Sequence, residues 1–316
     1  MGLPKFEYVA AKSVAEACRL LREAGGEARV MAGGTDLLVK LKAAASEALP
    51  RGTDAFNGAA PGGARSPRLV IGLRGIQELA VLAVTPGVGL TIGATAYLAD
   101  VASHPDVRRL YPAVSYAAAE TGTPQVRNMG TVVGNLCNAA PSADNAPALL
   151  ALDAELRLAT KETEGTMPLS QFFRGPGETA LRLGEIVTSV VVPEPPTRSG
   201  MSYRHLSARG RVDLSAVGAA ALVALDEGGR VRTARIALGG VAPTPLLVPE
   251  AAGLLVGVVP AAHIVAAAVA AAAEAARPIS DVRASAGYRR RMVRTLVERA
   301  LADAIGRASA GKEVGS

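Results

Sequence analysis

The chain has 316 residues, of which 49% are hydrophobic and 20% are charged, with a formal net charge of +6. Two cysteines and three histidines are too few for a disulfide framework, an iron–sulfur cluster or a histidine-rich metal site within the chain, so no metal ligand is expected. The basic residues are scattered and the chain lacks Trp, which argues against nucleic-acid binding. The N-terminus has no apolar signal core, so the protein is expected to be cytoplasmic.

The first segment predicts a strand, a helix, a second strand, a loop and a further helix. Ser13 caps an amphipathic helix that ends at Gly25 and Gly26, and the apolar strand Ala28–Met31 follows. The sequence A-G-G-T-D-L-L comes directly after that strand. A glycine pair between strand and helix lets backbone N–H groups approach a phosphate, although such turns are also common connectors. Residues 43–67, rich in Ala, Gly, Pro and Ser, predict an exposed loop or insertion of unknown role.

Residues 68–120 predict two strands, R-L-V-I-G-L and G-L-T-I-G-A-T, followed by helices at about 98–101 and 111–120. The glycine spacing that begins at Gly87 is a near miss to the dinucleotide fingerprint. It lies at a turn and within a strand, not between a strand and a helix, so no Rossmann site is predicted.

The stretch Thr121–Asp153 is the most informative part of the sequence. Its small residues allow close backbone approach to a ligand, and a loop that opens into a helix adds N–H groups that suit an anion. Asp144 can accept hydrogen bonds from a ribose hydroxyl or a heterocycle N–H. Two interpretations stay open from these residues: a site for a nucleotide-type cofactor, or a long capped loop that enters a helix at Asp144 or Asn145.

The C-terminal half predicts a second α+β unit. A strand ends at Pro193, and P-E-P-P-T-R-S-G marks an inter-domain junction or a long turn. Residues 215–225 and 231–241 predict an antiparallel pair joined by the hairpin turn D-E-G-G-R. Helices are expected at about 261–276 and 286–305.

Residues 253–273 lack charge over about the length of a membrane span. Alanine dominates them, and Pro260 and His263 interrupt them, so a packed helix of a soluble domain is expected instead. The last residues, 307–316, are expected to form a disordered tail.

Four separated motifs resemble the FAD-binding medium subunits of the molybdenum hydroxylases, the group of carbon monoxide dehydrogenase, xanthine dehydrogenase and 4-hydroxybenzoyl-CoA reductase. They are A-G-G-T-D-L-L at Ala32, V-R-N-M-G-T-V-V-G-N-L-C-N-A-A-P-S-A-D at Val126, L-G-G-V-A-P-T-P at Leu238 and D-V-R-A-S-A-G-Y-R-R at Asp281. The resemblance covers nearly the whole chain and implies an α+β fold. Residues 1–193 would form a two-lobed FAD-binding domain (lobes about 1–68 and 69–193), similar to vanillyl-alcohol oxidase and MurB-type flavoproteins, and residues 194–306 a small α+β C-terminal domain.

The resemblance also implies which residues bind FAD, with neutral backbone donors from two loops holding the diphosphate. The first pyrophosphate loop would comprise Ala32, Gly33, Gly34, Thr35 and Asp36, with Leu37 also in the site. The second would comprise Thr131, Val133, Gly134 and Asn135, with Gly130 and Thr121 close by. Asp144 would bind the adenosine ribose, the backbone of Val187 would meet the adenine, and His205 would lie near the flavin.

Three positions depart from the family pattern. Val133 stands where glycine is common, which would hold the backbone further from FAD. His205 stands at a usual lysine; it could donate a hydrogen bond or titrate near neutral pH, or be an ordinary surface histidine. Cys137 is followed directly by N-A-A-P-S-A-D, without the cysteine-rich insertion that binds a 4Fe-4S cluster in aromatic-CoA reductases, so Cys137 is interpreted as a packed side chain.

The function implied is electron transfer within a multi-subunit oxidoreductase. FAD would take electrons from two 2Fe-2S clusters on a small partner subunit, and a molybdopterin-containing large subunit would act on the substrate. A dimer of such heterotrimers is expected, with no integral membrane segment and no catalytic side chain in this chain. Two alternatives are a self-contained FAD-dependent oxidase or reductase of the same fold, and a non-enzymatic nucleotide-binding or assembly subunit.

Overall fold

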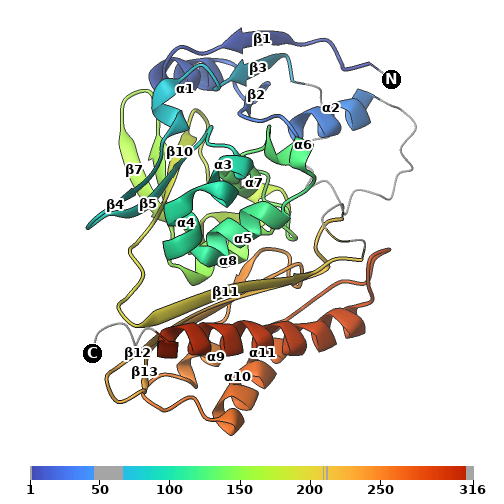
Figure 1. Ribbon diagram of the computed structural model, residues 1–316. Helices are drawn as coiled ribbons and strands as arrows, with labels where there is room; N and C mark the ends of the chain where they lie inside the picture. The colour runs from blue at the N-terminus through green and yellow to red at the C-terminus, as the bar shows by residue number, and fades with distance from the viewer. Residues whose placement is uncertain (1, 46–66, 209, 211–212, 311–316) are drawn as a thin grey trace. The chain divides into compact units, whose positions relative to one another are not determined.

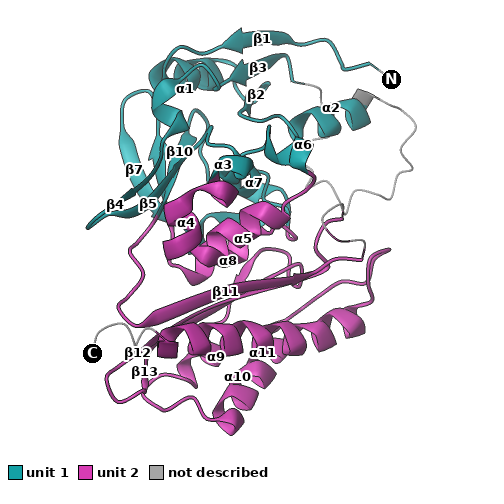
Figure 2. Cartoon of the chain, in the orientation of Figure 1, with its two compact units in different colours: residues 1–100, 124–140, 155–191 teal, residues 101–123, 141–154, 192–316 magenta. Residues whose placement is uncertain are grey.

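The computed structural model describes residues 2–45, 67–208, 210 and 213–310 (Figure 1). The predicted loop at residues 43–67 therefore lies almost entirely outside the described residues. The chain divides into two compact units, which interleave along the sequence (Figure 2). Unit 1 comprises residues 1–100, 124–140 and 155–191, and unit 2 comprises residues 101–123, 141–154 and 192–316.

Unit 1 begins with a parallel sheet of order β1-β3-β2, formed by β1 (Glu7–Ala10), β2 (Ala28–Met31) and β3 (Leu69–Gly72). Helix α1 (Val14–Glu23) packs against β2 and β3. Ser13 begins this helix, as predicted, because its hydroxyl accepts a hydrogen bond from the Glu16 N–H at 3.1 Å. The helix ends before Gly25 and Gly26, which both have positive φ angles.

The second sheet of unit 1 has the order β4-β5-β10-β6-β7. Its strands are β4 (Leu82–Thr85), β5 (Gly89–Gly93), β6 (Glu155–Ala159), β7 (Glu164–Pro168) and β10 (Ile186–Val192). The remaining elements of this unit are short: β8 (Phe173–Gly175), β9 (Glu178–Thr179), α2 (Leu37–Ala45), α3 (Leu98–Ser103, which crosses the unit boundary), α6 (Pro124–Arg127), α7 (Val132–Cys137) and the 3-10 turns η2 (Gln77–Ala80) and η3 (Leu169–Gln171).

Unit 2 is built on an antiparallel sheet of order β11-β12-β13-β14. Its strands are β11 (Ser199–Leu206), β12 (Val217–Leu225), β13 (Val231–Gly239) and β14 (Leu246–Leu247). Its helices are α4 (Pro105–Leu110), α5 (Pro112–Glu120), α8 (Asn145–Ala151), α9 (Pro249–Gly253), α10 (Ala262–Ala275) and α11 (Ala286–Ala310). Within this unit, α5 and α8 cover one face of the sheet and α11 the other (Figure 1).

Strand β12 shows why unit 2 has three layers. All nine of its residues are buried, which is expected of a strand covered on both faces. Its odd-numbered residues belong to the apolar core that includes α10 and α11. On the opposite face of the sheet, two glycines leave room for neighbouring groups. A Cβ on Gly218 would lie 2.8 Å from the Tyr203 hydroxyl oxygen, and a Cβ on Gly239 of β13 would lie 2.8 Å from Pro147 Cγ in α8. The missing side chains let α8 and the Tyr203 ring approach the sheet closely.

The predicted α+β class and the predicted hairpin of β12 and β13 are confirmed. The predicted helix at 261–276 is α10, whose small side chains Ala268, Ala272 and Ala273 are buried. No helix in the described ranges has the length and hydropathy needed to cross a membrane. Helix α11 runs to Ala310, so residues 307–310 of the predicted tail are helical, and residues 311–316 lie outside the described part. The side chains of Ala304 and Ala308 are buried in the core, which accounts for the extra helical turn.

The contact-defined units differ from the continuous domains predicted at 1–193 and 194–306. Residues 101–123 and 141–154 belong to unit 2 because α5 and α8 pack on the C-terminal sheet. The informative stretch Thr121–Asp153 is therefore shared between the units, with residues 124–140 in unit 1. Strand β11 was not predicted, because apolar and polar residues alternate in S-G-M-S-Y-R-H-L only over residues 201–204. Its pairing with β12 stabilises it.

Candidate functional site

The first predicted cofactor loop, residues 32–37, connects β2 to α2 in unit 1. Gly34 has a φ of +74°, a left-handed conformation that other residues rarely adopt. Gly33 is required for a different reason: a Cβ there would lie 2.0 Å from the Met129 carbonyl oxygen and 2.8 Å from the Gly130 Cα. The first loop therefore packs directly against the backbone of the second predicted loop.

The second predicted loop, residues 130–135, leads into α7. Thr131 is the N-cap of this short helix, and its Oγ1 accepts a hydrogen bond from the Gly134 N–H at 2.9 Å. The Gly130 carbonyl accepts a hydrogen bond from the Leu98 N–H at 2.9 Å, which holds the chain ahead of the helix. The first N–H groups of a helix lack partners within it, so this turn presents backbone donors that suit an anion.

Predicted residues from both loops lie together within unit 1. A Cβ on Gly130 would lie 3.4 Å from Thr35 Oγ1, so the loops touch through Thr35 as well as Gly33. Val133, which stands where glycine is usual, is only 3% exposed. Its side chain packs in the protein interior. The other predicted residues of these loops are in the same two segments: Ala32, Asp36, Leu37 and Asn135.

Arg74 places a positive charge beside the second loop, where the sequence interpretation expected only neutral donors. Its Nη2 lies 3.6 Å from Met129 Sδ, and its guanidinium carbon lies 5.4 Å from the centroid of the Tyr97 ring. The Tyr97 backbone forms a bridge with Thr131. Arg74 follows β3 in a segment without any motif, so no sequence signal connects it to the loop.

Asp144 occupies the N-cap position of α8, but its side chain makes no capping hydrogen bond. Its Oδ1 instead accepts hydrogen bonds from the Tyr203 hydroxyl at 2.6 Å and the Ser215 hydroxyl at 2.5 Å. Burial raises the pKa of the Asp144 carboxyl, against the hydrogen bonds from Ser215 and Tyr203 and the charge of His205, which lower it. The helix begins at Asn145, as one of the two open interpretations expected, but the Asp144 carboxylate does not cap it.

His205 extends this arrangement further into unit 2. Its Nδ1 lies 2.9 Å from Ser215 Oγ, and its Nε2 lies 3.4 Å from Glu120 Oε2. Its ring is parallel to that of Tyr203 within 7°, with centroids 6.0 Å apart. The side chains of His205 and Glu120 are each 9% exposed, so the interpretation of His205 as an ordinary surface histidine is wrong. We refer to Glu120, Asp144, Tyr203, His205 and Ser215 as the buried polar cluster.

Sequence reasoning missed three members of this cluster: Glu120, Tyr203 and Ser215. Tyr203 could have been found from β11 alone. Residues two apart on a strand point to the same face, so Tyr203 lies on the same face as His205. Because the sequence did not predict β11 as a strand, this rule could not be applied. Burial and desolvation raise the pKa of Tyr203 well above its usual value, with the Asp144 charge adding to the effect, so its hydroxyl stays a donor.

Thr121 and Val187, the remaining predicted residues, have distinct surroundings. Thr121 ends α5 in unit 2; its hydroxyl donates to the Ala117 carbonyl at 2.8 Å and accepts from Asn145 Nδ2 at 3.1 Å. This contact joins the end of α5 to the start of α8. Val187 lies in β10 of unit 1, is 4% exposed, and precedes a register shift in the pairing with β6.

Cys137 lies at the end of α7, and burial raises the pKa of its thiol to about 12. The thiol is therefore neutral at neutral pH, as a packed side chain is. Within the described ranges, no group of three or more His, Cys, Asp or Glu side chains is placed to hold a metal ion.

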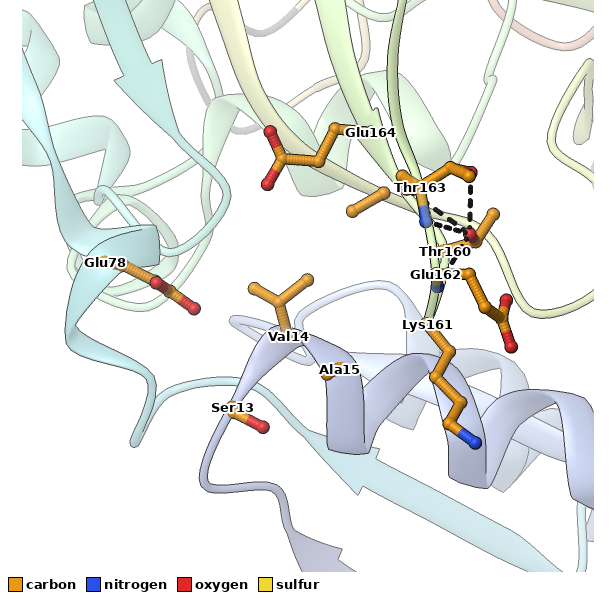
Figure 3. Close-up of a pocket in the computed structure, with 10 residues that line it drawn as sticks. Ser13, Val14, Ala15, Glu78, Thr160, Lys161, Glu162, Thr163 and Glu164 are labelled. Atoms are coloured by element: carbon orange, nitrogen blue, oxygen red, sulfur yellow. Dashed lines mark hydrogen bonds between the residues drawn. The ribbon is translucent and has the colours of Figure 1, made fainter.

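A hollow of about 290 Å³ in unit 1 lies between the start of α1 and the turn that joins β6 to β7 (Figure 3). Its lining includes three carboxylates, those of Glu78, Glu162 and Glu164, and the amine of Lys161. None of the predicted cofactor residues lines it. Its acidic lining also disfavours a diphosphate, so this hollow is not the cofactor site.

Comparison with known families places matches over most of the chain. Residues 61–195 match the family described as the FAD binding domain in molybdopterin dehydrogenase. Residues 202–304 match the CO dehydrogenase flavoprotein C-terminal domain.

Individual relatives are similar over nearly their whole length. The chain is 33% identical over 313 residues to the 6-hydroxypseudooxynicotine dehydrogenase complex subunit alpha of Paenarthrobacter nicotinovorans, covering 99% of each chain. It is 33% identical to the carbon monoxide dehydrogenase medium chain of Hydrogenophaga pseudoflava, covering 94% of this chain and 96% of the relative. A solved structure of carbon monoxide dehydrogenase from Hydrogenophaga pseudoflava contains a chain that matches with a TM-score of 0.87 at 32% identity, covering 97% of this chain and 99% of that one.

Proposed function

Because the chain belongs to the family of FAD-binding medium subunits of the molybdenum hydroxylases, we propose that it is the electron-transfer subunit of a multi-subunit enzyme of that kind. Bound FAD would supply the redox chemistry, taking electrons from the 2Fe-2S clusters of a small partner subunit and passing them to an external acceptor. A separate molybdopterin-containing subunit would oxidise the substrate. We expect a dimer of heterotrimers in the cytoplasm.

The contact between the two glycine loops carries the proposal. Gly33 lies against the backbone of Met129 and Gly130 with no space for a Cβ, and Thr131 caps the turn that follows. This arrangement offers backbone N–H donors without side chains in the way, which fits a diphosphate. Arg74, in contact with Met129, adds a positive charge that also suits it.

Asp144 fits the ribose for a separate reason. It is 6% exposed, and the hydrogen bonds from Tyr203 and Ser215 both fall on Oδ1. Oδ2 is therefore the carboxylate oxygen that neither hydroxyl engages, and a ribose hydroxyl can donate to it. We keep Thr121, Val187 and His205 as proposed FAD-binding residues. In this site the chain binds and orients the flavin, and electron transfer requires no general acid or base from it.

Purification of the chain alone tests the proposal. We expect a yellow protein that releases about one FAD per chain on denaturation, in line with a resident cofactor. Electron transfer to NAD⁺ or a quinone should require the partner subunits. A colourless chain that does not bind added FAD would contradict the proposal. Turnover of an organic substrate by the isolated chain would instead support a self-contained FAD-dependent oxidase or reductase.

We also keep the boundary at residue 193 as a proposal. Residues 193–198 connect β10 to β11 without regular structure. Limited proteolysis should cut there first if residues 1–193 and 194–306 are separate domains. Cutting confined to other segments would contradict the boundary.

A further inference from the structure

We infer that Tyr203 and Ser215 are positioning residues: their hydroxyls fix the carboxylate of Asp144 so that its second oxygen, Oδ2, meets a ribose hydroxyl of the cofactor. The inference rests on the proposed function, which assigns Asp144 to the ribose. All three residues lie in unit 2. Neither hydroxyl needs to touch the cofactor, because each acts through Asp144.

Two hydroxyls donate to the same carboxylate oxygen. Tyr203 Oη lies 2.6 Å and Ser215 Oγ lies 2.5 Å from Asp144 Oδ1, distances typical of O–H groups that donate to a carboxylate. The two donors come from different segments, since Tyr203 is in β11 and Ser215 precedes β12. A rotation of the carboxylate would break both hydrogen bonds. Fixing Oδ1 in this way therefore also fixes the direction of Oδ2.

Asp144 gives up a local hydrogen bond for this arrangement. It occupies the N-cap position of α8, where an aspartate side chain commonly accepts a hydrogen bond from a backbone N–H of the first helical turn. Here the side chain makes no capping hydrogen bond. An aspartate that served only to begin the helix would make that bond. The carboxylate is instead held by two side chains that are distant in the sequence.

The neighbouring strand leaves space for the Tyr203 hydroxyl. A Cβ at Gly218 of β12 would lie 2.8 Å from Tyr203 Oη, so a larger residue there would displace the hydroxyl. A glycine inside a strand often marks such a close approach. Tyr203 and Ser215 are each 3% exposed, so little water is available to replace either hydroxyl as a donor to Asp144.

A fixed carboxylate favours binding of the ribose in two ways. Oδ2 is the oxygen that neither Tyr203 nor Ser215 engages, and a ribose hydroxyl is a suitable donor to it. The Asp144 side chain is also ordered before the ligand arrives, so binding does not have to restrict its rotation. Loss of either hydroxyl should therefore weaken the contact between Asp144 and the ribose, although Asp144 itself is unchanged.

Two variants remove one donor each. Tyr203→Phe keeps the ring, which is stacked with the His205 ring, and Ser215→Ala removes only a hydroxyl. In each variant the carboxylate keeps one of its two hydrogen bonds and can turn more freely. Affinity for FAD should fall about three- to tenfold in each, as for the weakening of one hydrogen bond.

Ser202→Ala is the matched control. Ser202 is next to Tyr203 in β11, is also 3% exposed, and also donates to a carboxylate, that of Asp303 at 2.8 Å. Its loss should lower the thermal stability of the FAD-free chain much as Ser215→Ala does, but FAD affinity should stay within about twofold of the wild type. Thermal unfolding of each FAD-free variant confirms that it is folded.

The experiment is a titration of the full chain with two ligands, followed by flavin fluorescence. The ligands are FAD and an FAD analogue whose adenosine ribose lacks both hydroxyls. The wild type should bind FAD at least about tenfold more tightly than the analogue, as for a hydrogen bond to a charged group. Tyr203→Phe and Ser215→Ala should bind the analogue like the wild type, so the ratio of the two affinities should shrink only through weaker binding of FAD.

This ratio separates positioning from a merely structural role, which would weaken both ligands equally. An equal loss for both ligands in Tyr203→Phe and Ser215→Ala, or wild-type affinity for FAD in both variants, would overturn the inference. A loss in Ser202→Ala as large as in Ser215→Ala would also overturn it. So would a wild type that binds both ligands equally, because the ribose hydroxyls then make no contact. A wild type that binds neither ligand would instead contradict the proposed function.

Discussion

The two glycine loops of unit 1 and the buried polar cluster of unit 2 are built in opposite ways. The loops work through missing side chains: Gly33 leaves room for the Met129 carbonyl, and Gly34 supplies a left-handed backbone. The cluster works through charged and polar side chains, with two hydroxyls on one carboxylate oxygen. An added side chain should therefore disrupt the loops by steric clash, and a change in charge should disrupt the cluster.

The largest effect is expected from replacement of Arg289, which donates a hydrogen bond to the backbone next to Ser215 of the buried polar cluster. Arg289 is 3% exposed, donates to the carbonyls of Ala216 and Gly240, and pairs with Asp281 at 2.6 Å. Ala216 follows Ser215 directly in the sequence. Replacing Arg289→Met should lower the free energy of unfolding by about 3 kcal/mol, because Asp281 and two carbonyls lose a buried partner. Urea denaturation measures this, with Arg290→Met on the exposed neighbouring position as the control.

The same contact has a pH signature. Burial of Asp281 raises the pKa of its carboxyl, but hydrogen bonds from Arg283 and Arg289 outweigh burial and hold it below the ordinary value. A lowered pKa in the folded chain contributes stability above the unfolded pKa, and that stability is lost as the pH falls through the folded pKa. The wild type should therefore lose more stability than Arg289→Met on acidification below about pH 4. Equal losses in both chains would contradict this account.

Gly33→Val should break the loops of unit 1. The added Cβ cannot fit 2.0 Å from the Met129 carbonyl oxygen, so the backbone of one loop has to move. We expect loss of FAD from the purified chain and a drop of about 2 kcal/mol in the free energy of unfolding, as for overpacking of an interior. Gly165→Val is the control, since a Cβ at Gly165 meets nothing within 4 Å. Normal FAD content in Gly33→Val would refute the loop assignment.

The substitution Asp144→Asn in unit 2 should weaken FAD binding without lowering the stability of the folded chain. Burial raises the pKa of Asp144 in the folded chain, so the folded chain binds that proton more tightly than the unfolded chain does. Ionised Asp144 therefore costs stability at neutral pH, and the cost disappears as the pH falls through the raised pKa. Asp144→Asn should weaken FAD binding by about tenfold or more while leaving the FAD-free chain no less stable.

Titration of FAD and thermal unfolding of the FAD-free chain check this prediction. Asp106→Asn, at an exposed ion pair of α4, is the control. A destabilised Asp144→Asn variant with unchanged FAD affinity would assign the carboxylate a structural role instead.

The smallest effect on FAD affinity is expected from Arg74→Ala. The guanidinium contacts Met129 and the Tyr97 ring at an exposed position, where water screens its charge. Affinity for FAD should fall by a few-fold, about 0.5–1 kcal/mol, and the fall should shrink as salt is added. Arg68→Ala, outside the loops, should have no effect on FAD; an equal effect of both variants would indicate a general charge effect.

Local patterns predicted most of the secondary structure. Ser13 and the following glycines marked both ends of α1, and D-E-G-G-R marked the turn between β12 and β13. Strand β11 and the last turn of α11 were missed. Their stability comes from contacts with residues far away in the sequence, since β11 pairs with β12 and Ala308 packs in the core of unit 2.

The sequence by itself determined the α+β class, the two glycine loops and the family, because these depend on short motifs and on backbone conformations that only certain residues adopt. The tertiary structure decided what those residues contact. It placed Gly33 against Met129, buried Val133, and turned Asp144 from a helix cap into the acceptor for Tyr203 and Ser215. The hydrogen bonds from Tyr203 and Ser215 to Asp144 join residues 59 and 71 positions apart in the sequence. No local sequence pattern predicts contacts between residues so far apart.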